Sequence, residues 1–415
     1  MTVIRQDDFI DSVADALQFI SYYHPVDFVK AVHEAYEREQ NPAAKDAMGQ
    51  ILINSRMCAE GHRPICQDTG IVTVFLKIGM EVQWDATMSV SDMVNEGVRR
   101  AYTNPDNVLR ASILDDPAGA RRNTKDNTPA VIHMEVVAGD TVDVQVAAKG
   151  GGSENKSKLV MLNPSDSIVD WVVKTVPTMG AGWCPPGMLG IGIGGTAEKA
   201  AVLAKESLMD PIDIHELRER GPANRVEELR LEIMEAVNKL GIGAQGLGGL
   251  TTVMDVKIRD YPTHAASLPV AMIPNCAATR HAHFVLDGSG PALQTPPDIN
   301  DWPELTREVS DQVRRVNLDT VTRADVADWL PGDTLLLSGK MLTGRDAAHK
   351  KMKELIDSGV GLPEGVDLKG RFIYYVGPVD PVRDEVMGPA GPTTATRMDK
   401  FTDFILEQTL SLIHI

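Results

Sequence analysis

Cysteine is scarce in this chain: its 415 residues include only four. That number is too small for a disulfide scaffold, on which many small secreted domains depend. The chain also lacks a continuous apolar run of about 18 residues, so the sequence predicts no membrane-spanning helix. Its first residues carry neither the basic nor the apolar segment of a secretory signal. We therefore expect a cytoplasmic protein in a reducing compartment.

Positive charge is in deficit. Lysine and arginine number 41 against 58 aspartates and glutamates, which gives a formal net charge of −17. This excess of negative charge disfavours nucleic acids and anionic membrane surfaces as partners. An anionic small molecule would need a local pocket of arginine and lysine. The remaining composition, 43% hydrophobic and 24% charged, is typical of globular proteins, and the length predicts two or three domains.

Hydrophobic periodicity predicts a mixed α/β fold with a helical opening. A glycine-bearing turn, Ala138-Gly139-Asp140, predicts a hairpin between two of the strands. The predicted helices are 9–20, 27–38, 44–60, 91–102, 164–173, 196–209, 226–240 and 346–357, and the predicted strands are 71–78, 130–137, 141–148, 252–259, 268–273, 334–337 and 372–376.

A stretch rich in proline and glycine after Leu286 predicts a domain boundary. We expect an N-terminal domain at 1–290, a linker at 291–305 and a smaller, β-rich C-terminal domain at 306–415, with the active site at their interface. The last six residues, 410–415, equal the translation of CTG TCT CTT ATA CAC ATC, the end of a transposon adapter used for sequencing libraries. Our hypothesis is that the reading frame entered adapter DNA and that the natural C-terminus is missing.

Three of the four cysteines lie in glycine- or proline-rich motifs, whereas Cys58 lies on a predicted helix and reads as a core thiol. Zinc modules use closely spaced cysteine pairs, but these three motifs are far apart. Three thiolates without a fourth suit an iron–sulfur cube with one iron open to act as a Lewis acid. Three buried apolar thiols are the alternative interpretation. The motifs are Cys66-Gln67-Asp68-Thr69-Gly70, Cys184-Pro185-Pro186 and Asn275-Cys276-Ala277-Ala278-Thr279-Arg280-His281.

Together with three further motifs, in order along the chain, these segments resemble the class I, iron–sulfur fumarate hydratases in their fused single-chain form. The resemblance implies a [4Fe-4S] cluster on Cys66, Cys184 and Cys276 and the reversible hydration of fumarate to malate, a step of the tricarboxylic acid cycle. The further motifs are Lys149-Gly150-Gly151-Gly152-Ser153-Glu154-Asn155-Lys156, Gly344-Arg345-Asp346-Ala347-Ala348-His349-Lys350 and Gly391-Pro392-Thr393-Thr394-Ala395-Thr396-Arg397-Met398-Asp399.

The same resemblance implies a role for each matching residue. Asp68 would exchange a proton with the substrate hydroxyl, although a turn aspartate is the rival interpretation, and Thr393 would be the base at the carbon. His264 matches a histidine that reaches across a dimer interface, so we expect a homodimer. The family also uses a lysine whose position would fall beyond residue 415. The expected contacts to a small dicarboxylate come from Gln67, Arg110, Gly152, His264, Arg345 and Arg397.

Alternatives stay open at this level. Mesaconate or tartrate could replace fumarate, and a non-catalytic iron–sulfur or redox protein is a different class. The run Gly190-Ile191-Gly192-Ile193-Gly194-Gly195 satisfies G-x-G-x-x-G, the phosphate-binding pattern of dehydrogenases. No strand pattern follows with the acidic residue that a dinucleotide site needs. We therefore expect these glycines to form a tight strand-to-helix turn.

Overall fold

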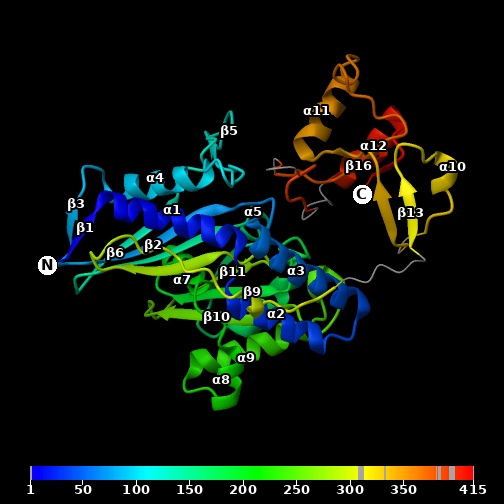
Figure 1. The fold of residues 1–415 in the computed structure, drawn as a ribbon. Coiled ribbons are helices and arrows are strands. Elements are labelled where there is room, and N and C mark those ends of the chain that lie inside the picture. The colour runs from blue at the N-terminus through cyan, green and yellow to red at the C-terminus, as the bar shows by residue number, and fades with distance from the viewer. Residues whose placement is uncertain are drawn as a thin grey trace. The chain divides into compact units, whose positions relative to one another are not determined.

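The computed structural model describes residues 2–306, 313–330, 333–379, 381, 385–391 and 398–414. The chain divides into two compact units, Met1–Leu305 and Thr306–Ile415 (Figure 1). Both units mix helices with sheets, so the α/β fold class is confirmed. Within the described residues, no helix combines the length and apolarity needed to cross a bilayer.

Two four-stranded sheets form the larger unit. The first has the order β12-β7-β2-β6 and the second β10-β9-β11-β8. The strands of the unit are β1 (Val3–Arg5), β2 (Ile71–Gly79), β3 (Gln83–Asp85), β4 (Leu114–Asp115), β5 (Arg122–Asn123), β6 (Val131–Val137), β7 (Val142–Lys149), β8 (Lys158–Leu162), β9 (Gly187–Gly194), β10 (Val253–Tyr261), β11 (Leu268–Asn275) and β12 (His281–Leu286).

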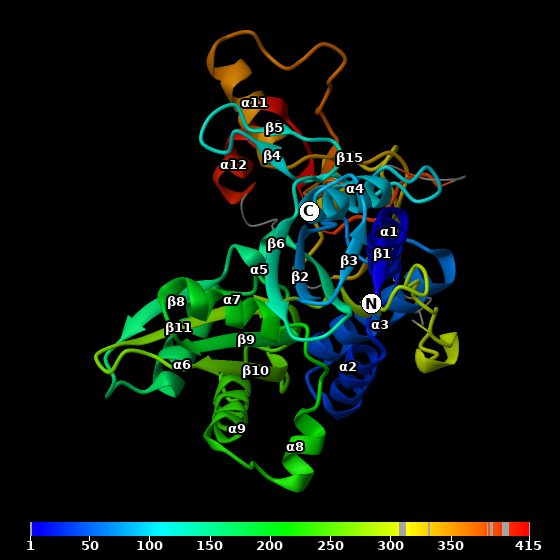
Figure 2. The same cartoon turned by 90° about the vertical axis from the view of Figure 1, so that its left-hand side faces the viewer.

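Helices cover both sheets (Figure 2). The α-helices of the unit are α1 (Gln6–Tyr22), α2 (Val26–Arg38), α3 (Pro42–Gly61), α4 (Val90–Tyr102), α5 (Gly151–Glu154), α6 (Ile168–Met179), α7 (Ala197–Ser207), α8 (Ile214–Arg220) and α9 (Arg225–Asn238).

The first sheet buries one face against α1 and α4. Val142, Val144 and Val146 alternate along β7 and are fully buried, as the period of two residues requires. Phe9 and Val13 of α1 pack against them in the same core. The helix α4 is capped by Ser89, whose hydroxyl accepts a hydrogen bond from the Asp92 amide at 3.1 Å.

The predicted hairpin is wrong. β6 and β7 do not pair with each other, because β2 lies between them, parallel to β6 and antiparallel to β7. The amides of Met80 and Glu81, at the end of β2, donate to the carbonyls of Val137 and Gly139 at 2.9 and 3.0 Å. β2 therefore forms the backbone hydrogen bonds that β6 and β7 would have formed with each other in a hairpin. The predicted helix 164–173 is also displaced, since Ser167 caps a helix that starts at Ile168.

The helix α7 packs directly on β9 because glycines face it. A Cβ on Gly190 would lie 2.2 Å from the Ala204 carbonyl oxygen, and one on Gly192 would lie 1.9 Å from that of Ala200. Any side chain there would force α7 away from the sheet. Most of the G-x-G-x-x-G run is therefore strand: Gly190–Gly194 belong to β9, and only Gly195 lies in the predicted strand-to-helix turn. Close packing explains two of its glycines. On the other face of this sheet, α6 and α9 close the core.

The described residues of the smaller unit form two small sheets, β13-β14 and β15-β16-β17, with three helices. Buried Ile373, Met398 and Ile405 lie in one of its two hydrophobic clusters. The strand β17, within the segment 410–415 discussed above, pairs in parallel with β16. The elements are β13 (Arg314–Asn317), α10 (Arg323–Val326), β14 (Leu335–Ser338), β15 (Leu342–Thr343), α11 (Asp346–Asp357), β16 (Phe372–Tyr374), α12 (Asp399–Thr409) and β17 (Ile413–His414).

Candidate active site

The three motif cysteines meet in the larger unit. Cys66 precedes β2, Cys184 precedes β9 and Cys276 follows β11. The strands β9 and β11 are antiparallel neighbours, and the Ala277 amide donates to the Cys184 carbonyl at 3.1 Å, which joins the second and third loops. All three thiols are free.

The charges of the cysteine thiolates affect one another's pKa values. Burial raises the pKa of Cys66 to about 11, with the Arg280 cation acting in the opposite direction and the Cys276 thiolate adding to the rise. Burial also raises the pKa of Cys184, and the thiolates of Cys276 and Cys66 raise it further. Buried thiolates without a positive partner are unfavourable, so the pocket suits a positively charged, sulfur-binding group.

Cys184 has an unusual backbone. Its φ of 57° lies in the left-handed region, which residues other than glycine rarely adopt. Its amide donates to the Ala181 carbonyl at 2.9 Å, which helps to hold this conformation. Strain of this kind collects at functional sites, where the surrounding structure imposes it.

Asp68 is fixed by two backbone amides. Its Oδ1 accepts from Gly70 at 3.2 Å, and its Oδ2 accepts from Gly151 at 2.7 Å. Gly70 has a φ of +89° and packs against Ala148 at the end of β7, with no room for a side chain. The first cysteine loop and the glycine loop after β7 therefore meet at this carboxylate.

The glycine loop is held by buried charges. Lys149, 5% exposed, donates from Nζ to the Ser153 hydroxyl at 2.7 Å, and that hydroxyl donates to the Gly150 carbonyl at 3.1 Å. Glu154 pairs with Lys205 of α7 and lies 3.5 Å from the Lys149 ammonium. Burial lowers the pKa of Lys149 to about 8, although Glu154 opposes that shift.

Three of the predicted substrate contacts lie close to these loops. Gln67 is buried, and its Oε1 accepts from the Cys66 thiol at 3.4 Å. Gly152 lies in α5, directly after Gly151, whose amide donates to Asp68. Arg110 has an exposed side chain, and its carbonyl accepts a hydrogen bond from the Thr69 hydroxyl. The larger unit thus gathers Gln67, Asp68, Gly152 and the backbone of Arg110.

Of the other predicted residues, His264 is the one that belongs to the larger unit. His264 is exposed and follows β10, at the end of the second sheet where Gly194 pairs with Tyr261. Cys184 and Cys276 lie at the opposite end of that sheet, about 25 Å away along eight residues of β9. Arg345 belongs to the smaller unit, where it precedes α11. Thr393 and Arg397 lie outside the described residues.

The residues fit an iron–sulfur cluster better than a single metal ion. In the described part of the chain, no three His, Cys, Asp or Glu side chains are gathered closely enough to bind one ion. The cysteines of a cluster bind different irons, so their sulfurs stand further apart than the ligands of one ion. Buried nitrogens of Arg280 and of Trp183, the residue before Cys184, have no hydrogen-bond partner among the described residues. Cys58 is 4% exposed and donates to the Pro64 carbonyl at 3.7 Å, and burial together with the nearby Cys66 thiolate raises its pKa to about 12.

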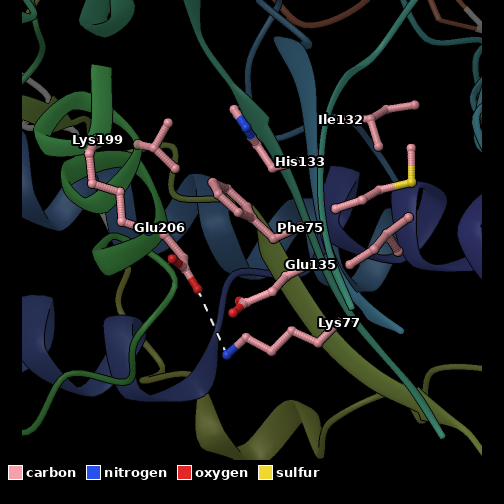
Figure 3. Close-up of a pocket in the computed structure, with 10 residues that line it drawn as sticks. Phe75, Lys77, Ile132, His133, Glu135, Lys199 and Glu206 are labelled. Atoms are coloured by element: carbon pink, nitrogen blue, oxygen red, sulfur yellow. Dashed lines mark ion pairs between the residues drawn. The ribbon is translucent and has the colours of Figure 1, made fainter. Parts of the chain in front are cut away.

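A hollow of about 460 Å³ lies between β2, β6 and α7, apart from the cysteine motifs (Figure 3). His133 stacks on Phe75 there, with ring centroids 4.7 Å apart. Lys77 faces Glu206 at 4.0 Å. Because charges of both signs line this hollow, it offers no clear preference for a dianion, and the cysteine loops remain the candidate site.

Two buried cations at the site were not singled out from the sequence. Lys149 and Arg280 both lie inside the matched motifs, but nothing in the sequence distinguished them from surface charges. Their positions next to strands could have identified them as buried: Lys149 ends a strand whose residues alternate in burial, and Arg280 directly precedes β12.

Comparison with known proteins agrees along the chain. The family profile described as fumarate hydratase (Fumerase) matches residues 10–285, and that of the fumarase C-terminus matches 288–415. The anaerobic class I fumarate hydratase of Escherichia coli K12 is 33% identical over 379 residues, covering 88% of this chain and 68% of that protein. A putative class I fumarate hydratase of Geobacillus stearothermophilus is 30% identical over 416 residues, or 92% and 77% of the two chains. The putative L(+)-tartrate dehydratase subunit alpha of Methanocaldococcus jannaschii is 36% identical over 278 residues, or 66% and 95%.

Proposed function

Because this chain belongs to the class I fumarate hydratase family, we propose how its own residues carry out the family's reaction. The protein is a hydro-lyase that adds water reversibly across the double bond of fumarate to give malate. The chemistry is difficult in both directions, since hydroxide is a poor leaving group and the proton on the neighbouring carbon is weakly acidic.

The family's cofactor is an iron–sulfur cluster, and we propose a [4Fe-4S] cluster held by Cys66, Cys184 and Cys276. When bound, such a cluster supplies one iron without a protein ligand as a Lewis acid for oxygen atoms of the substrate. The observation that carries this proposal is the meeting of three thiols, from three distant loops, beside an oriented carboxylate. An air-sensitive cofactor of this kind also suits a reducing cytoplasm.

Asp68 is the group that exchanges a proton with the substrate hydroxyl. Two backbone amides hold its carboxylate, so its orientation is set before the substrate arrives. A positioned acid or base of this kind contributes about 10²–10⁴-fold to the rate. Thr393 is proposed as the base at the carbon on the strength of the family resemblance.

The two carboxylates of the substrate need cationic partners. We assign them to Arg110, Arg345 and Arg397, with Gln67 and the backbone at Gly152 completing the contacts. Arginine offers a two-pronged contact that a lysine cannot reproduce. Lys149, Lys205 and Arg280 add positive charge around the loops of a chain whose net charge is −17. This local charge favours binding of a dianion.

His264 serves the active site of a second subunit in this proposal, which makes the protein a homodimer. The support is its position, exposed and about 25 Å along the sheet from the cysteines of its own chain. Co-expression of His264→Asn and Asp68→Asn chains tests it. Hybrid dimers should regain activity that both homodimers lack, because one of their two sites has neither change. An inactive hybrid would assign His264 to the site of its own chain, and an active His264→Asn homodimer would place it outside the active site.

Anaerobic purification tests the function as a whole. We expect a brown protein with iron and sulfide that hydrates fumarate and loses activity in air. Tartrate is the second candidate substrate, favoured by the similarity to the M. jannaschii subunit, and mesaconate should be assayed beside it. A colourless protein would refute the cluster, and a brown protein inactive on all three acids would refute the hydro-lyase.

A further inference from the structure

Arg280 is a buried cation that forms no ion pair with any described residue. It is 4% exposed, and no described residue accepts a hydrogen bond from its buried Nε and Nη2 atoms. Its backbone is anchored, since its carbonyl accepts from the Ala148 amide at 3.1 Å. Burying a charge without partners is costly, so such a group in a folded protein calls for an explanation.

The chain satisfies a comparable arginine elsewhere. Arg230 is 8% exposed, and its guanidinium donates to the Val256 carbonyl at 2.7 Å and to Asp255 at 3.1 Å. It also pairs with Asp213. The unpaired nitrogens of Arg280 are therefore a local feature of its surroundings.

Those surroundings are the cysteine loops. A Cβ built on Gly150 would lie 3.3 Å from the Asp68 Oδ2 and 3.7 Å from the Arg280 Nη2, so the carboxylate and the guanidinium flank the same glycine. The backbone amide of Asp68 in turn donates to the Cys66 sulfur at 3.4 Å. The guanidinium is thus a near neighbour of the first cysteine loop.

The cavity beside Arg280 is too small for substrate. Its volume is about 20 Å³, and Lys149, Lys205 and Arg280 contribute to its lining. That space accommodates about one water molecule, not a dicarboxylate. The size of this cavity therefore excludes a role for Arg280 within it as a fourth arginine that binds the substrate.

We propose that Arg280 is a positioning residue of the cysteine pocket, whose N–H groups donate to sulfur atoms of the cluster once it is bound and offset their negative charge. This inference rests on the proposed iron–sulfur function and assigns Arg280 to the cofactor, not to the substrate. Hydrogen bonds to cluster sulfurs and nearby charge set the reduction potential of such groups. Outer-shell partners of metal ligands typically change metal affinity or activity by 10–100-fold when they are removed.

The test compares Arg280→Gln and Arg280→Lys with the wild-type chain under anaerobic conditions. We expect Arg280→Gln to lose iron to a chelator about 10- to 100-fold faster and to have a more negative cluster potential. Arg280→Lys should be intermediate, because it keeps the charge but not the planar fork. An unchanged release rate and potential in Arg280→Gln would overturn the proposal.

A second measurement separates this role from a structural one. In the full chain stripped of iron, Arg280→Gln should be at least as resistant to urea as wild type, because it removes an unpaired buried charge. The matched control, Arg230→Gln, breaks a satisfied network and should weaken the stripped chain. A stripped Arg280→Gln chain weaker than wild type would assign Arg280 to the fold. Failure of the proposed function itself appears separately, as wild-type protein without iron.

Discussion

Replacing Asp68 by asparagine removes the negative charge from the proposed proton-exchange group with little change in shape. Loss of a positioned acid or base lowers kcat by about 10²–10⁴-fold, which is roughly 3–5 kcal/mol of transition-state stabilisation. KM should change much less, because Asp68 is assigned to proton transfer and not to substrate binding.

The substitution also has a structural cost that the geometry bounds. Asp68 accepts one amide at Oδ1 and another at Oδ2, and an asparagine has only one side-chain oxygen. Losing a hydrogen bond to a charged acceptor costs about 1.5–3 kcal/mol of folding stability. We therefore expect a lower unfolding midpoint together with the fall in kcat.

The assay measures kcat and KM for fumarate in anaerobic, iron-loaded protein, with iron content and unfolding midpoint determined on the same samples. Asp298→Asn is the matched control, because the Asp298 Oδ1 accepts the amide of Asn300 two residues on, at 3.0 Å, in an exposed turn. The control should keep full activity. A kcat for Asp68→Asn within tenfold of wild type, at equal iron content, would show that Asp68 is a turn residue and not a proton carrier.

Three further predictions follow from single features. Cys184→Ser should abolish bound iron, sulfide and fumarate hydration together, and activity that survives in iron-free protein would contradict the ligand set. Gly192→Ala should destabilise the larger unit by about 1–3 kcal/mol or more in urea unfolding, because its methyl group would meet the Ala200 carbonyl; an unchanged midpoint would count against that packing. Burial lowers the pKa of His24 to about 3, so the neutral ring is favoured and stability should fall as pH drops from about 6.5 towards 3. At pH 4.5, the iron-free chain should lose roughly 2–3 kcal/mol relative to neutral pH, and a similar loss in His24→Gln would assign it to other groups.

Local pattern predicted most helices of the larger unit. The apolar spacing of Phe9, Val13 and Leu17 marks a helix whose buried stripe lies against the first sheet. Strand pairing was not accessible in the same way. β2 lies between β6 and β7 although it precedes both by many residues. Nothing in the sequence of the turn at Gly139 indicates that β6 and β7 pair with β2 and not with each other.

The candidate site shows the same division. The motifs marked Cys66, Cys184 and Cys276 because their glycines and prolines stand out in sequence, and the structure brings them together. The partnerless state of Arg280 is a property of burial and of neighbours from other loops, so sequence alone could not reveal it. The remoteness of His264 likewise follows from the length and direction of β9 and β10, not from its own motif.

The dispersal of the three cysteines over separate loops has a consequence for the life of the protein. The unfolded chain does not hold the three cysteines together, because a different strand positions each of them in the fold. With the proposed ligand set, folding of the chain precedes binding of the cluster, unlike in small zinc modules, where the metal itself organises the chain. When iron is scarce, we expect the chain to fold without its cluster and to stay inactive until a cluster is inserted.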